Sequence, residues 1–486
     1  MKVNQNVSAV ISNAHLHRTE DKLTASIERL SSGYKINKAK DNPAGMAIGN
    51  KMRAQIMALD QSSRNAADGT SVLQTADGAL NETHSMLQRM RELAVQAATD
   101  TMATSDKEAC QKEIEALQKE VDRIATDTEF NGKRILDGSQ DYRVYPSVDG
   151  ELAGTYIRNF QTSDEVAAED YIFEITEVAK QATVDFTVAP GTEGIVKING
   201  SAVEILDTDT EDDIYTKLKE AGELGNVKVE KNGTDTYKLT SFDYGKSAKI
   251  SAIDLTGTEI TVEGKDTEIK LVRDTDIRLD SAGNQVKDDK GDPLPYGEGF
   301  SETATYLSDG KKVTIRDLNG FEMIFEVDPE KDTGGLMQKQ IQDKGKVNVN
   351  LEMTDLGSMT LQVGAHENQV VDVRIPAVNC ESLYIDDLNV VRKDGAKKAM
   401  VALDDAIAQV SEVRSRIGAY QNRLEYAVSS LDGTEENMEA AISRVMDTDM
   451  AEEMSTYSNM NVLDQAAISV LTQANDMPQQ VLQLLQ

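Results

Sequence analysis

Apolar residues recur every seven positions through a long stretch of the N-terminal third of the chain. The repeat consists of Met52, Leu59, Ala66, Leu73, Leu80, Leu87 and Ala94, with Ala76, Met90 and Ala97 at the intermediate spacing. This pattern predicts one helix from about residue 46 to residue 98. At 1.5 Å per residue such a helix is about 80 Å long. It needs a partner along most of its length, because its apolar stripe cannot be buried otherwise.

Three further segments keep the same heptad spacing and are predicted helices. Their apolar positions are Cys110, Ile114, Leu117, Val121 and Ile124 in the first, Met400, Leu403, Ile407, Val410, Ile417, Leu424, Val428 and Leu431 in the second, and Leu463, Ala467, Val470, Ala474, Met477, Val481 and Leu484 in the third. Ser105 with Glu108 predicts a capping box at the start of the first. The pairs Asn131-Gly132 and Asp137-Gly138 predict turns after it, so the helical region ends near Phe130.

The middle of the chain, from about residue 142 to residue 390, has a different pattern. Short alternating runs such as ATVDFTVAP, GIVKING and EITVEG are separated by Gly, Asn and Asp, which predicts mostly β-strand. Each helical end has an apolar stripe that it cannot bury alone, so the two ends are expected to meet in one antiparallel bundle. The predicted fold class is α+β: a heptad-patterned helical bundle built from both chain ends, with β-rich outer domains inserted between them.

The two terminal stretches are compatible with helices but rich in Asn, Gln and Ser. A lone amphipathic helix of that length is marginal in water. We therefore expect both ends to be largely disordered in the free chain and to fold when they dock on other copies of the chain.

Composition excludes several classes of function. The net charge of -33 argues against nucleic-acid binding, because phosphates are neutralised by clustered Lys and Arg. No run approaches eighteen apolar residues and the N-terminus has no signal-peptide pattern, so neither membrane insertion nor a cleaved leader is expected. Two cysteines, Cys110 and Cys380, in 486 residues do not indicate a disulfide framework; we expect Cys110 to be a small core residue and Cys380 a strand residue.

Several runs at both ends resemble the bacterial flagellins, the subunits of the flagellar filament. These runs are IERLSSGYKINKAKDNPAGMAIGNKM, LQRMRELAVQAA, FNGKRILDG, SRIGAYQNRLE, DTDMAEEM and QANDMPQQVLQLLQ, in the family's order. A further run, MTLQVGAHENQ at 359–369, resembles a segment that in short flagellins follows soon after FNGKRILDG. Here more than two hundred residues intervene, which identifies the middle as an insertion. Within it, residues 194–222 are similar to a small β-β-α motif of flagellins and hook-associated proteins.

The resemblance implies a division of the chain. Residues 1–44 and 450–486 would be terminal helical arms in the inner core of a filament. Residues 45–141 and 356–449 would form the helical bundle with a β-hairpin region, and 142–355 the inserted outer domains, with a possible nested lobe at 187–255. The implied function is a structural subunit of the bacterial flagellar filament for motility, which polymerises by coupled folding and heterologous helical packing.

The same resemblance implies the partners and the location. The partners would be other copies of the chain, a flagellar export chaperone, the cap and the hook-associated proteins. The location would be the extracellular filament, reached by the flagellar type III route. Two alternatives stay open: a hook-associated junction protein, which shares the terminal bundle, and a secreted adhesin, which would need a sticky, aromatic-lined face.

Two sets of residues are candidates for assembly. The apolar positions of the arms are Val3, Val7, Val10, Leu23, Ile27, Leu30, Leu463, Val470, Met477, Val481 and Leu484. The basic residues of the joint between arms and bundle are Lys35, Lys38 and Lys40, which stand out in so acidic a chain. We expect these lysines to contact Asp447, Asp449, Glu452 and Glu453 within or between copies, although solvated loop lysines are an equal alternative.

LQRMRELAVQ is similar to the segment that Toll-like receptors of animals recognise in many flagellins. Position by position, the resemblance implies receptor binding by Arg89, Leu93 and Glu113; the alternative is a charged helix face selected for assembly.

No enzyme, metal or cofactor site is expected. The four histidines form no metal-binding motif, and the acidic run at 207–213 has Asp212 where a calcium loop requires Gly, which favours a turn or a helix cap.

Overall fold

The computed structural model describes residues 6–99, 101–148, 151–152, 156–163, 165–233, 235–255, 258–273, 276, 299–331, 336–354 and 356–484. The chain forms two compact units. Unit 1 comprises residues 1–70, 361–371 and 422–486, and unit 2 comprises residues 71–360 and 372–421. Two long helices, α2 (Pro43–Ala97) and α6 (Gly395–Met446), each contribute residues to both units.

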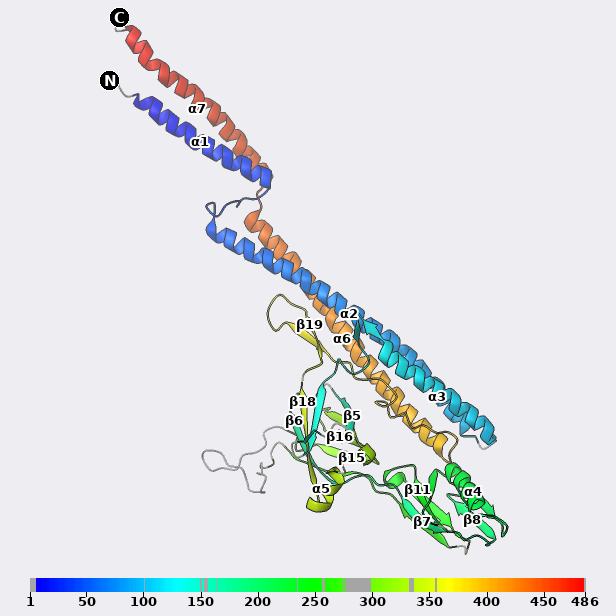
Figure 1. Ribbon diagram of the computed structural model, residues 1–486. Helices are drawn as coiled ribbons and strands as arrows, with labels where there is room; N and C mark the ends of the chain where they lie inside the picture. Colours follow the sequence, from blue (N-terminus) through cyan, green and yellow to red (C-terminus); the bar gives the residue numbers. More distant parts are fainter. Residues whose placement is uncertain are drawn as a thin grey trace, which may run out of the picture. The chain divides into compact units, whose positions relative to one another are not determined.

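Unit 1 consists mainly of helices. It contains α1 (Val7–Ser32) and α7 (Met450–Leu484), which lie side by side (Figure 1), together with the beginning of α2 and the end of α6. These parts of α2 and α6 are antiparallel: Gly49 packs on Met446, Ser63 binds Asp432 and Gly69 packs on Leu424. Strands β19 (Met359–Gln362) and β20 (Val370–Val373) form a hairpin whose connecting residues belong to this unit.

In the helical part of unit 2, α2 and α6 are also antiparallel, with Arg414 bound to Asp77 and Arg91 to Asp404. The third helix, α3 (Thr104–Asp127), joins α2 through Arg89 and Glu113. The predicted stripe is the core: Leu59, Ala66, Leu73, Ala76, Leu80, Leu87, Met90, Ala94 and Ala97 are all buried. The heptad prediction is therefore confirmed, and the helix that it defines begins three residues earlier and ends one residue earlier than predicted.

The capping box predicted from Ser105 and Glu108 is wrong. The N-cap of α3 is Ala103, which makes no side-chain cap bond. The backbone N–H groups of Asp106 and Lys107 donate instead to the carbonyl of Ala103. Ser105 therefore lies in the first helical turn, two positions after the N-cap, where its hydroxyl cannot act as the cap.

A short hairpin follows α3, as the sequence predicts. Strands β1 (Glu129–Phe130) and β2 (Lys133–Arg134) are joined by Asn131 and Gly132, whose φ angles are 51° and 75°. Two consecutive positive φ angles define the turn that Asn-Gly favours between antiparallel strands.

The β-rich part of unit 2 has two hydrophobic cores. The first lies between sheets of order β14-β6-β18-β3-β4 and β15-β16-β17-β5. Their strands are β3 (Arg143–Val148), β4 (Glu151–Leu152), β5 (Ile157–Thr162), β6 (Asp170–Glu177), β14 (Glu268–Leu271), β15 (Thr305–Asp309), β16 (Lys312–Arg316), β17 (Glu322–Val327) and β18 (Val347–Thr354), with α5 (Leu336–Lys344) beside β18.

The second core is a lobe that lies between β6 and β14 in the sequence. Its buried residues run from Ala182 to Ala252, with Val262 packed at the margin. Its elements are β7 (Thr183–Thr187), β8 (Gly194–Ile198), β9 (Ser201–Ile205), α4 (Glu211–Leu224), β10 (Val227–Lys231), β11 (Thr236–Ser241), β12 (Lys249–Ile253) and β13 (Glu259–Glu263). The sheet orders are β10-β11-β7 and β13-β12-β8-β9.

The acidic run at 207–213 forms the start of α4. The Thr210 hydroxyl accepts a bond from the backbone N–H of Asp213, and the Asp213 carboxylate accepts one from the backbone N–H of Thr210. The Thr210 hydroxyl also donates to the Asp213 carboxylate, and this bond, together with the one from the backbone N–H of Thr210, holds the pKa of Asp213 below its usual range. The helix-cap interpretation of this run is confirmed.

The predicted fold class is confirmed: helices from both chain ends pair in antiparallel fashion, and β-rich domains are inserted between them. The prediction that Cys380 is a strand residue is wrong. Cys380 lies in a turn at 380–384, where its thiol donates to the carbonyl of Gln118 and its backbone N–H donates to Asp122. Burial raises the pKa of this thiol, and both cysteines are buried and free.

Candidate assembly surface

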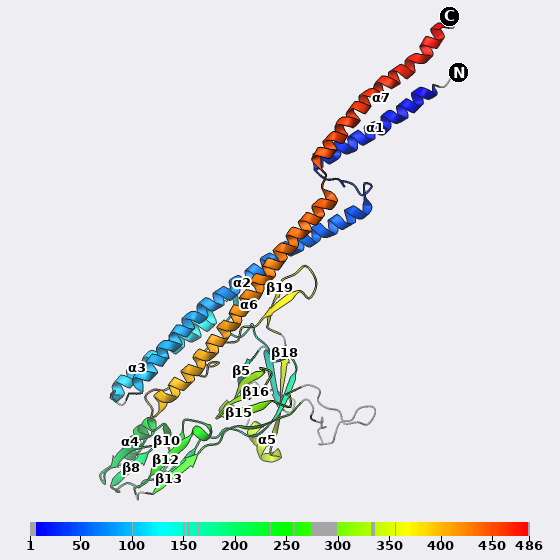
Figure 2. The ribbon, with the colours of Figure 1, turned by 180° about the vertical axis from the view of Figure 1, so that it is seen from behind.

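The terminal helices α1 and α7 form an antiparallel pair, which both views show (Figure 1, Figure 2). At one end of the pair the side-chain amide of Asn6 donates to the carbonyl of Ala474 at 2.8 Å. At the other end Arg29 lies 3.6 Å from Glu453. The pair thus brings together residues 6–32 and 450–484, which are almost the whole chain apart in sequence.

Local sequence signals set the ends of both helices. The Asn6 side chain accepts a bond from the backbone N–H of Ala9, and Gly33 ends α1 in the left-handed conformation with φ 75°. Asp449 accepts bonds from the backbone N–H groups of Ala451 and Glu452 at the start of α7. Acidic residues there also favour the positive end of the helix dipole.

Apolar side chains on this pair are exposed to a degree that a packed monomer does not explain. In α1, Val10 is 68% exposed, and in α7, Val462 is 63% exposed. The exposed large apolar residues of the two helices are Val7, Val10, Ile11, Ile27, Met450, Met454, Val462, Leu463, Ile468, Val470 and Met477. Within the described part of the pair, Ser26 and Ala474 are the buried residues. Large apolar side chains exposed along two paired helices indicate a site of interaction.

Most of the predicted assembly residues belong to this exposed set. Leu23 and Leu30 are half-buried, while the other described members are exposed. Val3 and the side chains of Val481 and Leu484 lie outside the described residues. Sequence reasoning missed Ile11, Met450, Met454, Val462 and Ile468, although all of them are large apolar residues of the two helices.

The joint between the arms and the long helices is a compact structure. The backbone N–H of Lys35 donates to the carbonyl of Met446 at 2.6 Å, and that of Thr448 donates to Gly33 at 3.0 Å. The two chain segments of the joint therefore bind each other through their backbones.

The three joint lysines have different surroundings. The Lys38 ammonium lies 2.7 Å from the carboxylate of Glu28, and this hydrogen bond raises the pKa of Lys38. The Asp41 carboxylate accepts the backbone N–H of Lys38, which lowers the pKa of Asp41. Lys38 thus pairs with a residue of its own arm. Within the described residues, the side chains of Lys35 and Lys40 form no ion pair with the C-terminal acids.

Two glycines of α2 permit the close packing of the joint. A Cβ at Gly45 would lie 2.6 Å from the side chain of Ile36, and one at Gly49 would lie 2.6 Å from the sulfur of Met446. Two glycines one helical turn apart are an uncommon choice in a helix, because each costs about 0.5–1 kcal/mol relative to Ala. The presence of both glycines in a predicted helix was therefore the sequence signal for a close contact at this joint.

The chain is similar to curated flagellins over nearly their full length. A flagellin of Salmonella muenchen is 32% identical, and the alignment covers 99% of each chain. This chain belongs to the flagellin family. Flagellin B of Vibrio anguillarum is 29% identical, with 100% of this chain and 99% of the relative covered.

Family models match both ends of this flagellin. The bacterial flagellin N-terminal helical region matches residues 3–141, and the C-terminal helical region matches residues 400–485. Among solved structures, FliC from Burkholderia pseudomallei aligns with 73% of this chain and 99% of its own at 18% identity, with a TM-score of 0.23. Hook-associated protein-3 from Legionella pneumophila aligns with 82% and 98% at 12% identity, with a TM-score of 0.31. Family membership follows from the sequence relatives alone.

The residues that the flagellin resemblance implies for receptor binding form one cluster on α2 and α3. Arg89 lies 2.8 Å from Glu113 and 3.1 Å from Glu92, and the hydrogen bond to Glu113 raises the pKa of Arg89. The side chains of Arg89 and Glu113 are about half exposed. Leu93 is only 2% exposed, so it supports the helix packing beneath the surface and does not itself form part of the surface.

The described residues of this flagellin contain no helix long and apolar enough to cross a membrane. Across the same ranges, no group of three or more His, Cys, Asp or Glu side chains is arranged to hold a metal ion.

Proposed function

We propose that this flagellin is the structural subunit of an extracellular flagellar filament and that it polymerises through the exposed apolar surface of α1 and α7. The observation that carries the proposal is the exposure of large apolar side chains along both helices. Each fully buried Val, Leu, Ile or Met side chain contributes about 1.5–3 kcal/mol relative to an exposed one. Packing α1 and α7 against neighbouring copies therefore supplies the driving force for growth.

The symmetry of the contact explains why growth does not stop. A surface that meets a different surface of the next copy generates an open helical filament unless the rotation closes. The pair of α1 and α7 buries few side chains in a single chain, so its order depends on the next copy. Folding coupled to addition restrains premature polymerisation and favours growth on an existing end.

The division of the chain belongs to the same proposal. Residues 1–44 and 450–486 form the inner core of the filament, 45–141 and 356–449 form the bundle, and 142–355 form the outer domains. An export chaperone, the cap and the hook-associated proteins are the further partners, and the type III flagellar route delivers the chain. The net charge of -33 suits an outer surface that must stay dispersed.

A second function, as ligand of a Toll-like receptor, is favoured by the half-exposed pair of Arg89 and Glu113. Two charged groups of opposite sign, fixed by each other on adjacent helices, offer a preorganised polar contact. Filament packing and receptor binding then use overlapping faces of the bundle. The receptor therefore binds the monomer and not the filament.

Seeded elongation tests the proposed function. Purified full-length chain is added to sheared filament fragments and growth is followed by light scattering and electron microscopy. We expect long tubes, and we expect a variant lacking residues 450–486 to remain a soluble monomer. Failure of the full chain to elongate any seed would reject the filament subunit and favour a junction protein or adhesin.

A further inference from the structure

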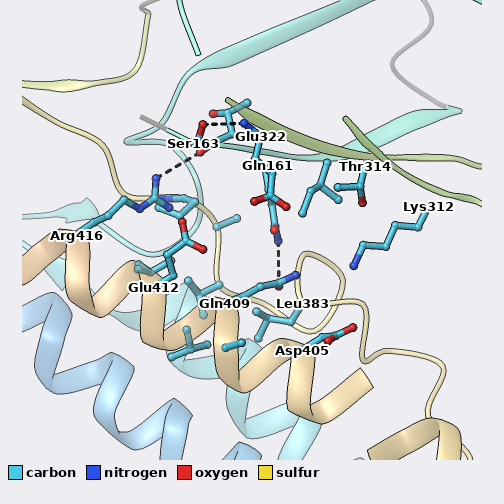
Figure 3. A pocket seen from close by; sticks show the side chains of 18 of the residues that line it. Gln161, Ser163, Lys312, Thr314, Glu322, Leu383, Asp405, Gln409, Glu412 and Arg416 are labelled. Atoms are coloured by element: carbon cyan, nitrogen blue, oxygen red, sulfur yellow. Dashed lines mark hydrogen bonds between the residues drawn. The ribbon is translucent and has the colours of Figure 1, made fainter. Parts of the chain in front are cut away.

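A cavity of about 250 Å³ lies in unit 2 between α6 and the sheet β15-β16-β17-β5. Side chains alternate across the strands, so Val313, Ile315, Met323 and Phe325 face the hydrophobic core. The intervening residues Lys312, Thr314, Glu322 and Ile324 line the cavity from the sheet side. From α6 the cavity is lined by Asp405, Ala408, Gln409, Glu412, Val413 and Arg416 (Figure 3).

Both walls carry charged residues, including Glu322 on the sheet wall and Arg416 on the helix wall. Lys312 lies on the sheet wall, and Asp405 and Glu412 lie on the helix wall, two turns apart on one face of α6 (Figure 3). Among the described residues, none of these three side chains forms an ion pair. Arg316 differs, because it is bound to Glu322 at 2.7 Å.

Other groups in the cavity are held in place. The Lys312 ammonium lies 4.6 Å from the centroid of the Tyr384 ring, which fixes the direction of this side chain. The side-chain amide of Gln161 donates to the carbonyl of Ser382 at 2.5 Å and to the side chain of Gln409 at 3.4 Å. The floor is apolar, with Leu383 and Val410 buried. The cavity thus combines an apolar floor with a few oriented polar groups, as small-molecule sites do.

We propose that this cavity binds a small ligand with one carboxylate and two cationic groups, which is the chemistry of a free basic amino acid such as L-lysine. The carboxylate binds at Lys312, and the two ammonium groups bind at Asp405 and Glu412. These two acids are about 10 Å apart along the helix axis, which suits two separated cations better than a single one. The assignment is independent of filament assembly, because all its residues lie in unit 2 and none in α1 or α7.

The expected affinity is modest. Asp405 and Glu412 are exposed to solvent, so each contact is screened and contributes little alone. We therefore expect a dissociation constant on the order of 1 mM at low salt, weakening as ionic strength rises.

Isothermal titration of the full-length chain with L-lysine tests the proposal. Cadaverine, which lacks the carboxylate, and hexanoate, which lacks the ammonium groups, are the ligand controls and are expected to bind at least about tenfold more weakly. Lys312→Gln and Asp405→Asn should each weaken L-lysine binding about tenfold. The matched control variants Lys238→Gln and Asp185→Asn change exposed residues of the lobe and should bind L-lysine as the parent does.

Three results would overturn the proposal. The first is no saturable binding of L-lysine up to about 50 mM. The second is binding that neither Lys312→Gln nor Asp405→Asn weakens, and the third is cadaverine binding as tight as that of L-lysine. Circular dichroism of each variant shows that it is folded, so that loss of binding reports the cavity itself.

Discussion

Arg89 in α2 and Glu113 in α3 form an ion pair at 2.8 Å, although 24 positions separate them in the sequence. Arg89 donates two hydrogen bonds to the same carboxylate oxygen, from Nε and from Nη2. The pair links two helices at the surface, so it has both a structural and a recognition interpretation. Exposed ion pairs contribute little to the free energy of unfolding, so an experiment can separate the structural interpretation from the recognition interpretation.

Arg89→Asp should weaken binding of the monomer to the receptor by at least about tenfold while the chain stays folded. The substitution places two carboxylates opposite each other and removes the cation, and a central charged residue of an interface is worth tenfold or more in affinity, about 1.4 kcal/mol. Surface plasmon resonance with the immobilised receptor ectodomain measures the loss. Arg123→Asp is the control, because Arg123 is an equally exposed arginine of α3 paired with Glu120 and Asp127.

The exchange variant Arg89→Glu with Glu113→Arg separates the two interpretations. It keeps an ion pair between the helices but reverses its direction. If the pair acts only in helix packing, this double variant binds the receptor as the parent does, and the receptor assignment fails.

Val470→Asp should stop filament growth without unfolding the chain. Val470 is 52% exposed in α7, so the monomer loses little when it changes, whereas a charge buried between copies is costly. Seeded elongation followed by light scattering measures the effect. Ser469→Asp adds the same charge at an adjacent exposed position outside the apolar set and should elongate at a rate close to the parent's. If the Val470→Asp variant elongates as fast as the parent, this face of α7 is not part of the interface between copies.

Amide hydrogen exchange should be fast at residues 6–32 in the monomer and slow in the filament. The helix α1 buries only Ser26 among its residues, so its backbone bonds have little protection in a single chain. Packing between copies in the filament covers the backbone of α1 and so protects its hydrogen bonds. Mass spectrometry measures the exchange rate of α1 in the monomer and in the filament. The buried part of α2 near Leu80 is the internal reference. Equal protection of α1 in both states contradicts coupled folding.

Periodic features of the fold were predictable from the sequence, and specific side-chain partners were not. The stripe through Leu73 and Leu80 predicted a buried helix face because a seven-residue repeat is a local pattern. The turn at Asn131 and Gly132 was predictable for the same reason. The start of α3 at Thr104 was not, because a shift of two residues decides whether Ser105 caps the helix.

The candidate site shows the same limit. Helix periodicity indicated the apolar arms, but the partner of Lys38 could not be chosen among 84 acidic residues without the bend that places Glu28 beside it. The cavity facing α6 could not be predicted either, since Lys312 and Asp405 are distant in sequence and line one cavity only because a sheet packs on a helix.

Reversing the charges of Lys35, Lys38 and Lys40 to Glu should impair polymerisation more than it destabilises the monomer. Within one chain Lys38 has an exposed partner, so its removal has a small effect on folding. Between copies the three lysines would meet acids such as Asp447 and Glu452. Elongation rates at low and high salt provide the measurement, because screening weakens the contact in the parent. Unchanged elongation by the triple variant discards an ionic role for the joint.

Gly222→Ala should destabilise the lobe, whereas Gly78→Ala should stabilise the chain slightly. Both glycines lie inside helices, where alanine is favoured by about 0.5–1 kcal/mol. A Cβ at Gly222 of α4 would lie 2.7 Å from the carbonyl oxygen of Val227, a backbone atom that cannot rotate away, while a Cβ at Gly78 of α2 meets nothing within 4 Å. Overpacking of this kind costs about 1–3 kcal/mol, which exceeds the gain in helix propensity. Differential scanning calorimetry should therefore show the two substitutions shifting the transitions of the chain in opposite directions. A rise in the lobe's transition temperature in the Gly222 variant would mean that α4 and β10 separate enough to accept the methyl group.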